Sequence, residues 1–137
     1  MTRAGAAALL AVAVLFAGSL ASRSASATTL PHLSLLRSSP VADTTLTASP
    51  MDIRLWFSQA PEMAATTVRV TASSGTVMAL DKPQRDKAED APVIATLQRP
   101  LTPDVYEVAW RTMSRDGHVV KGQFSFTVAA TGTGRSR

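Results

Sequence analysis

Residues 114–128 read Ser-Arg-Asp-Gly-His-Val-Val-Lys-Gly-Gln-Phe-Ser-Phe-Thr-Val, a tight-turn signal followed by an alternating pattern. Asp116-Gly117 is a dipeptide typical of hairpin turns. Beyond it, three apolar side chains recur at every second position: Phe124, Phe126 and Val128. This period predicts a strand with one buried face. Asp116 and His118 are two residues apart and so project to the same side of an extended backbone.

The same two-residue period recurs in shorter segments towards the start of the chain. Strands are predicted at residues 32–37, 52–58, 67–72, 76–80, 93–97 and 105–113. We expect a hairpin turn at 73–75, a loop or weak edge strand at 41–50 and a solvated loop at 81–90. No segment past residue 27 has a convincing 3.6-residue apolar period. About seven short strands of this spacing predict an all-β, antiparallel two-sheet Greek-key sandwich or barrel.

The start of the chain predicts a secretory signal peptide over residues 1–27. A short basic beginning precedes an apolar run from Ala4 to Leu20, and Ala25-Ser26-Ala27 supplies a cleavage signal. Ser19-Leu20-Ala21 is a second candidate cleavage site, and an uncleaved membrane anchor is the alternative. We therefore expect one β-sandwich domain over residues 28–130 and a disordered tail over 131–137.

The charge balance argues against a nucleic-acid partner. Loss of the leader removes Arg3 and Arg23, which leaves 12 basic against 10 acidic side chains, and the basic residues are scattered. The chain has no cysteine, so the domain depends on its core, and zinc-ribbon and iron–sulfur chemistry are excluded. Trp56 and Trp110 lie within alternating strands and are predicted to be core or rim aromatics.

Few residues suit catalysis. The sequence has no nucleophile elbow, no phosphate-binding glycine loop and only two histidines. His32, Asp116 and His118 remain as candidate metal ligands, and this set suits copper(II) or zinc(II) equally. Each residue also has an ordinary interpretation: a histidine in a frayed chain end, an acid in a tight turn, and a surface histidine.

Two blocks of sequence resemble the CopC-like copper-resistance proteins of bacterial envelopes. The first joins His32 and the Ser38-Ser39-Pro40 turn to the strand Ile53-Arg54-Leu55-Trp56-Phe57-Ser58. The second, which is more specific, comprises the segments 106–111, 114–118 and 122–128, which resemble the family's "Y-x-V-x-W-R", "S-x-D-G-H" and "F-x-V" signatures. The likeness extends from His32 to Val128.

The resemblance implies a cupredoxin/immunoglobulin-like β-sandwich that binds copper(II) in the periplasm, with His32, Asp116 and His118 as ligands. It further implies a monomeric, non-enzymatic protein of copper homeostasis, which sequesters copper or delivers it to a CopD-like inner-membrane transporter. In the family the first histidine also offers its free α-amine. This chain departs there, because Pro31 precedes His32 and cleavage after Ala27 leaves four residues ahead of it.

Two further expectations concern a copper(I) site and the functions that compete with copper(II) binding. Some family members carry a methionine-rich copper(I) site, whereas the methionines here are scattered and are predicted to be core filler: Met51, Met63, Met78 and Met113. We therefore expect no dedicated copper(I) site. The competing functions are a histidine-brace copper oxygenase acting on polysaccharide, which requires a free N-terminal histidine, and a metal-free immunoglobulin-like envelope adaptor.

Overall fold

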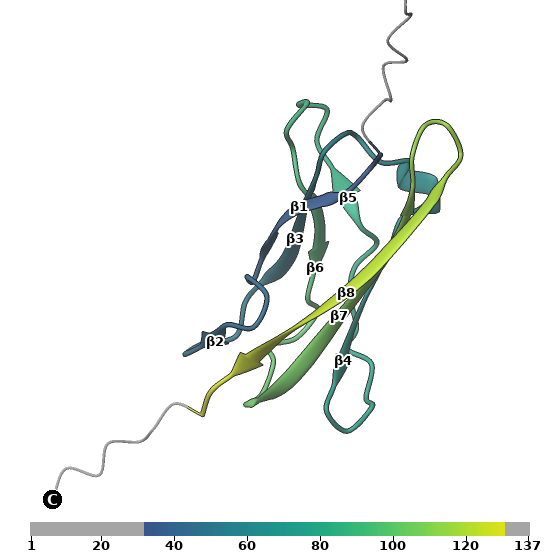
Figure 1. Cartoon of the computed structure of the whole chain (residues 1–137). Coiled ribbons are helices and arrows are strands. Elements are labelled where there is room, and N and C mark those ends of the chain that lie inside the picture. The colour runs from purple at the N-terminus through teal and green to yellow at the C-terminus, as the bar shows by residue number, and fades with distance from the viewer. Residues whose placement is uncertain (1–31, 131–137) are drawn as a thin grey trace, which may run out of the picture.

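The computed structural model describes residues 32–130, which form two facing four-stranded sheets (Figure 1). One sheet has the strand order β1-β3-β6-β5 and the other β2-β8-β7-β4. The strands are β1 (Leu35–Ser39), β2 (Thr45–Leu46), β3 (Asp52–Phe57), β4 (Thr67–Ala72), β5 (Gln84–Arg85), β6 (Val93–Thr96), β7 (Asp104–Met113) and β8 (Val119–Val128). A single 3₁₀ turn, η1 (Met63–Ala65), is the one helical element in the described residues. The predicted two-sheet sandwich is confirmed.

The core lies between the sheets and uses the alternating positions that the sequence marks. Tyr106, Val108 and Trp110 of β7 are buried, and the residues between them are exposed or half-buried. Tyr106 stacks on Phe126 with ring centroids 5.7 Å apart, and its hydroxyl donates to the Thr102 carbonyl. Since successive strand residues point to opposite faces, one apolar stripe per strand suffices to build this core.

The two tryptophans take different positions. Trp110 is only 8% exposed and packs edge-to-face on Phe57 with centroids 5.1 Å apart. Trp56 is half-buried, and the Arg37 guanidinium lies 4.1 Å from its ring centroid. The prediction that both are core or rim aromatics is therefore confirmed, with Trp110 in the core and Trp56 at its rim.

Several details depart from the predicted strands. The segment 76–80 makes one β-bridge to β4, between Thr71 and Val77, and then leaves that hairpin. Its second bridge joins Leu80 to Leu97, which directly follows β6 of the other sheet. The segment is a crossing between the sheets rather than a strand. The predicted solvated loop at 81–90 contains the two-residue strand β5. The segment 41–50, predicted as a loop or weak edge strand, contains the two-residue edge strand β2, which confirms that prediction, and β2 pairs with β8 in the parallel sense. His32 lies ahead of β1 and not within a strand.

The methionine prediction is confirmed at Met63 and Met78, which pack against the core. It is wrong at Met51, which is 83% exposed in the loop before β3, and Met113 is half-buried at the end of β7, outside the hydrophobic core cluster. Within residues 32–130, no helix is long and apolar enough to cross a bilayer. The predicted signal peptide and the C-terminal tail lie outside the described residues.

Candidate metal centre

The β7–β8 loop, residues 114–118, is a tight hairpin connection. The Ser114 amide donates to the His118 carbonyl at 2.9 Å, and the Gly117 amide donates to the Ser114 carbonyl at 2.9 Å. Gly117 has φ of 88°, a conformation that glycine adopts without steric cost. The predicted Asp-Gly turn is confirmed, and it places Asp116 and His118 at the tip of the hairpin.

Asp116 is anchored from three sides. The Ser114 hydroxyl and, at 3.4 Å, the His118 amide donate to its Oδ1, while Oδ2 lies 2.7 Å from His118 Nδ1. Ser114 is itself only 4% exposed, so its hydroxyl is held in place. The Ser114 hydroxyl, followed by His118, lowers the Asp116 pKa to about 2. The carboxylate is therefore ionised throughout the physiological range.

The His118 ring is exposed but oriented. Its side chain has 71% of its surface accessible, yet Nδ1 is engaged by the Asp116 carboxylate. When Nδ1 carries the proton of that hydrogen bond, Nε2 is left with a free lone pair. A carboxylate that orients an imidazole in this way is a common arrangement around metal-binding histidines. His118 is thus prepared to present Nε2 to an ion.

His32 is positioned by its backbone. The next residue, Leu33, is only 3% exposed and anchors the start of the described chain. Ser58 is hydrogen-bonded to the same segment: its hydroxyl donates to the His32 carbonyl at 3.3 Å and accepts from the Ser34 amide at 3.0 Å. The Ser58 amide in turn donates to the Ser34 carbonyl at 2.9 Å. His32 is consequently held at a defined place although its side chain is exposed.

The fold brings the two histidines together. The beginning of β1 and the β7–β8 loop lie at the same end of the sandwich (Figure 1), and the His32 and His118 ring centroids are 6.4 Å apart, with an interplanar angle of 87°. A first-row divalent ion about 2 Å from a ring nitrogen lies roughly 3 Å from the ring centroid. Two rings on opposite sides of one ion would therefore be roughly 6 Å apart, close to the observed separation.

The three predicted ligands gather at one end without forming a closed cluster. Asp116 contacts His118, and His118 faces His32. No three histidine, aspartate or glutamate side chains within residues 32–130 are already grouped tightly enough to hold a metal ion. The arrangement is an open and exposed set of three candidate ligands. The ligand assignment remains a prediction at this point.

Sequence reasoning missed the two serines that support the site. Ser114 and Ser58 touch Asp116 and the His32 backbone, respectively. Ser114 lies within the motif around Asp116, so its spacing offered a signal. Ser58 lies one residue beyond β3, and nothing in the local sequence indicates that it reaches the chain start.

Comparison with known proteins adds a family match. The model of the CopC domain matches residues 35–129. The chain is 37% identical over 123 residues to copper resistance protein C of Xanthomonas campestris pv. juglandis, covering 84% of this chain and 91% of that protein. It is 28% identical over 109 residues to the copper transport protein CutJ of Bacillus subtilis, covering 80% of this chain but 20% of CutJ.

Solved structures of the same family share the fold. CopC from Methylosinus trichosporium OB3b superposes with a TM-score of 0.66 at 28% identity, covering 72% of this chain and 94% of that one. PcoC from Escherichia coli, described as a methionine-rich copper resistance protein, gives a TM-score of 0.62 at 27% identity. It covers 71% of this chain and 98% of its own length.

Proposed function

The chain belongs to the CopC domain family, and from this premise we propose that it is an exported protein that binds copper(II) through His32, Asp116 and His118. The observation that carries the proposal is the approach of the His32 ring to within 6.4 Å of the His118 ring. The two histidines come from opposite ends of the domain sequence, and they are the whole histidine content of the chain.

The donor set favours copper(II) as cargo. Imidazole nitrogen and carboxylate oxygen suit copper(II), which stands at the top of the affinity order of divalent first-row metals. Copper(I) prefers thiolate and thioether sulfur. The chain has no cysteine, and the exposed Met51 lies in the loop before β3 while Met63 and Met78 pack against the core. A copper(I) site is therefore not part of the proposal.

Each of the three residues has a separate role. His118 presents Nε2, and His32 supplies the second imidazole from the segment ahead of β1. Asp116 is the third ligand: its carboxylate, which holds the His118 ring through Nδ1 in this structure, supplies an oxygen donor and negative charge that offsets the charge of the cation. The exposure of His118, at 71% of its side-chain surface, suits an ion that must be loaded and released rather than permanently enclosed.

We propose delivery to a membrane copper transporter of the CopD-like kind as the fate of the ion, with sequestration as the simpler form of the same activity. The B. subtilis relative supports delivery, because it is named a copper transport protein and this chain matches only 20% of its length. A domain of this kind thus forms part of a larger transport protein there. Neither resistance nor transport requires catalysis, and we propose that the protein acts as a monomer without enzymatic activity.

Export is the remaining part of the proposal. We propose that residues 1–27 are a signal peptide, that cleavage follows Ala27 and that the domain of residues 28–130 acts in the periplasm. The apolar run from Ala4 to Leu20 and the Ala25-Ser26-Ala27 signal support this. N-terminal sequencing of the exported protein tests it and also determines whether His32 has a free α-amine. A mature chain that begins at His32 would overturn cleavage after Ala27.

Copper(II) titration with electron paramagnetic resonance tests the binding itself. The parent should bind one copper(II) ion per chain with at least two nitrogen donors, and His118→Ala should lose one of them and at least tenfold in affinity. Met51→Leu, an exposed substitution outside the site, is the control and should bind like the parent. If His118→Ala titrates like the parent, the proposed site is wrong.

A further inference from the structure

Three cations converge on the outer face of the β4–β7–β8 sheet. Arg111 of β7 lies directly opposite Lys121 of β8, and its partner in β4 is Thr67. Arg69, two residues further along β4, projects from the same face and is the diagonal neighbour of Arg111. All three are exposed, and within residues 32–130 none of them takes part in an ion pair.

This arrangement is unfavourable for the isolated fold. Like charges directly opposite each other on neighbouring strands destabilise a sheet. Glu107 supplies a carboxylate on the same face of β7, but it accepts a hydrogen bond from Gln123 instead of pairing with a cation. An uncompensated group of cations is therefore better explained by a ligand than by folding.

The cations border a shallow hollow that is open to solvent. A cavity of about 520 Å³ is lined by Arg69, Arg111 and Lys121 together with Ala109, Gln123 and neighbouring backbone. Ala109 is the small residue at its centre, because it is paired with Arg69 on one side and with Gln123 on the other. The methyl group of Ala109 leaves room that a longer side chain would fill.

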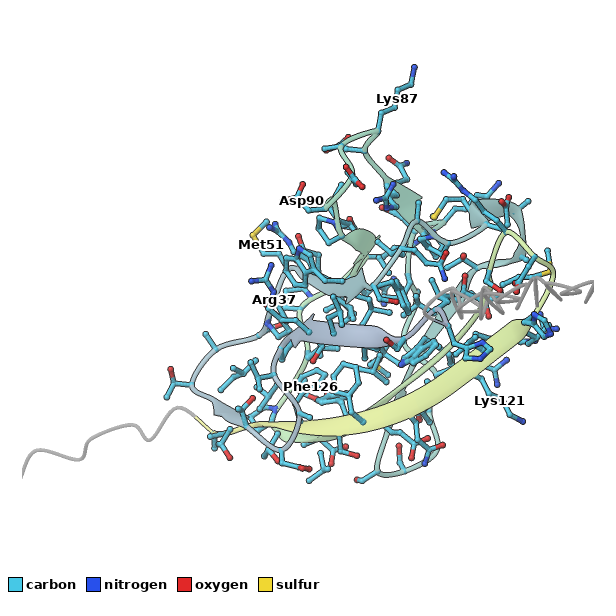
Figure 2. The ribbon with its side chains drawn as sticks, turned by 45° about the horizontal axis from the view of Figure 1, so that its top comes forward. Arg37, Met51, Lys87, Asp90, Lys121 and Phe126 are labelled. Atoms are coloured by element: carbon cyan, nitrogen blue, oxygen red, sulfur yellow. The ribbon has the colours of Figure 1, made fainter. Side chains whose placement is uncertain are left out.

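The hollow adjoins the candidate copper site. Arg111 lies two residues before the end of β7, and Lys121 lies three residues after His118 at the start of β8. Figure 2 shows Lys121 on the side of β8 opposite to Phe126, which points into the core. A partner held in the hollow would therefore sit against the same hairpin that carries Asp116 and His118.

We infer that this hollow docks an acidic peptide segment of a partner protein. The three cations span three adjacent strands, which is roughly 10 Å at about 4.8 Å per strand spacing. Two carboxylates on one side of an extended segment are about 7 Å apart and can engage cations on both sides of the hollow at once. A single phosphate is too compact to span that width. The further step, that this partner receives the copper, rests on the proposed function.

Binding of an acidic peptide to the copper-free mature protein tests the inference. A fluorescein-labelled decamer of glutamate, titrated at low salt, should bind the parent and be released by added sodium chloride, because exposed charge pairs are screened. The variant Arg69→Gln/Arg111→Gln/Lys121→Gln should bind at least tenfold more weakly. The control Lys82→Gln/Lys87→Gln/Arg99→Gln removes the same charge from exposed positions outside the hollow and should bind like the parent.

The outcomes separate this inference from the proposed function. If both triple variants bind the peptide equally weakly, the hollow is not the docking site, and the peptide is held only by the general positive charge of the protein. Tighter binding of inorganic phosphate or phosphatidylglycerol vesicles than of the peptide, with the same dependence on the three cations, would overturn the acidic peptide as the occupant. Copper(II) titration of each variant is run alongside, and thermal unfolding confirms that each is folded. Peptide binding can thus fail while copper binding stands, or the reverse.

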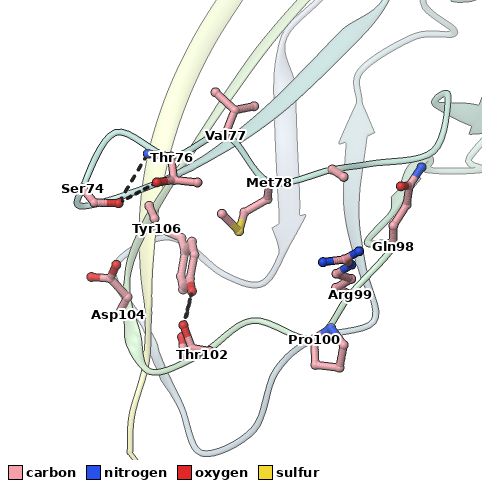
Figure 3. A pocket seen from close by; sticks show the side chains of 12 residues that line it. Ser74, Thr76, Val77, Met78, Gln98, Arg99, Pro100, Thr102, Asp104 and Tyr106 are labelled. Carbon is pink, nitrogen blue, oxygen red and sulfur yellow. Dashed lines mark hydrogen bonds between the residues drawn. The ribbon is translucent and has the colours of Figure 1, made fainter.

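The largest remaining cavity lies at another part of the sandwich and carries no proposal. It is bordered by the 72–79 segment and the loop before β7 (Figure 3). Several of its polar groups are already engaged: Tyr106 donates to the Thr102 carbonyl, and Ser74 pairs with Thr76. Nothing in its lining selects one ligand chemistry.

Discussion

His32 and His118 lie edge-to-face with ring centroids 6.4 Å apart, one ahead of the first strand and the other ahead of the last. This approach joins the two sheets at one end of the sandwich. Under the proposed function the two histidines serve one copper(II) ion, and a testable stoichiometry follows from that proposal.

The first prediction is that the histidines act on the same copper(II) ion. The parent should bind one equivalent, and His32→Ala and His118→Ala should each weaken that single event. The double variant should lose little more copper(II) affinity than the single variant that binds more weakly, because two ligands of one shared ion have non-additive effects. Isothermal titration provides both numbers. Two equivalents in the parent, falling to one in each single variant, would instead indicate two independent sites.

The second prediction concerns Ser114. Its hydroxyl is the main cause of the lowered Asp116 pKa, so Ser114→Ala in the metal-free protein should raise that pKa from about 2 towards 3.8. Because the Asp116 pKa is lower in the folded protein than in the unfolded chain, its ionisation stabilises the folded loop at any pH above about 3.8. That stabilisation is lost as the pH falls from about 3.8 to about 2. Carboxyl chemical shifts followed by NMR measure it. An unchanged Asp116 pKa would remove Ser114 from this role.

Ser114→Ala should also weaken copper(II) binding, by roughly 10-fold to 100-fold, as is usual when a group that orients a ligand is removed. The matched control is Ser74→Ala, whose hydroxyl contacts Thr76 in a hairpin outside the site. A loss of affinity in both variants would point to general destabilisation.

The third prediction concerns Ser58, whose hydroxyl is hydrogen-bonded to the His32 carbonyl and the Ser34 amide, on either side of Leu33. Ser58→Ala should free the His32 backbone, speed hydrogen exchange at the Ser34 amide and weaken copper(II) binding. The Asp116 pKa should stay at about 2, because its partners Ser114 and His118 are untouched. A variant with faster exchange and undiminished copper affinity would show that the position of His32 is not required.

The fourth prediction concerns acid release of copper. Protons compete with the ion for imidazole nitrogen, so the copper(II) affinity should fall as the pH drops. The Asp116 carboxylate, with its pKa of about 2, stays ionised from about pH 8 down to about pH 5. Copper(II) titrations over that pH range test this. A fall that begins only near pH 4, roughly the ordinary carboxyl range, would assign control to carboxylates instead.

The fifth prediction concerns the packing of Gly122 against Trp110. A Cβ added at Gly122 would lie 2.7 Å from Trp110 Cζ2 and 2.9 Å from Cε2, so Gly122→Ala must displace the indole. Overpacking of this kind costs about 1–3 kcal/mol of unfolding free energy. Thermal denaturation measures the loss. In the double variant with Trp110→Phe the loss should be smaller than the sum of the two, because the smaller ring relieves the clash.

Much of the fold could be read from local pattern. The strand predicted at 67–72 coincides with β4, and those at 52–58 and 105–113 differ from β3 and β7 by one residue at one end. Alternation between the faces of a strand is set by neighbouring residues, so it is visible in sequence. The sequence does not show that the chain leaves the hairpin after Val77, because that path depends on the bridge between Leu80 and Leu97, which lies in another segment. Met51 was assigned to the core for its apolarity, yet its loop leaves it exposed.

The candidate site divides in the same way. Asp116-Gly117 and His118 form a turn whose chemistry is local, and the sequence alone determined that turn, the sandwich class and the likeness that singles out three residues. Only the tertiary structure decided that Ser58 holds the backbone at His32 and that the His32 ring faces His118. It also decided that Arg69 stands beside Arg111 and Lys121 across three strands. Those relationships are contacts between residues far apart in the chain, and strand order and register, which a local pattern does not encode, bring them together.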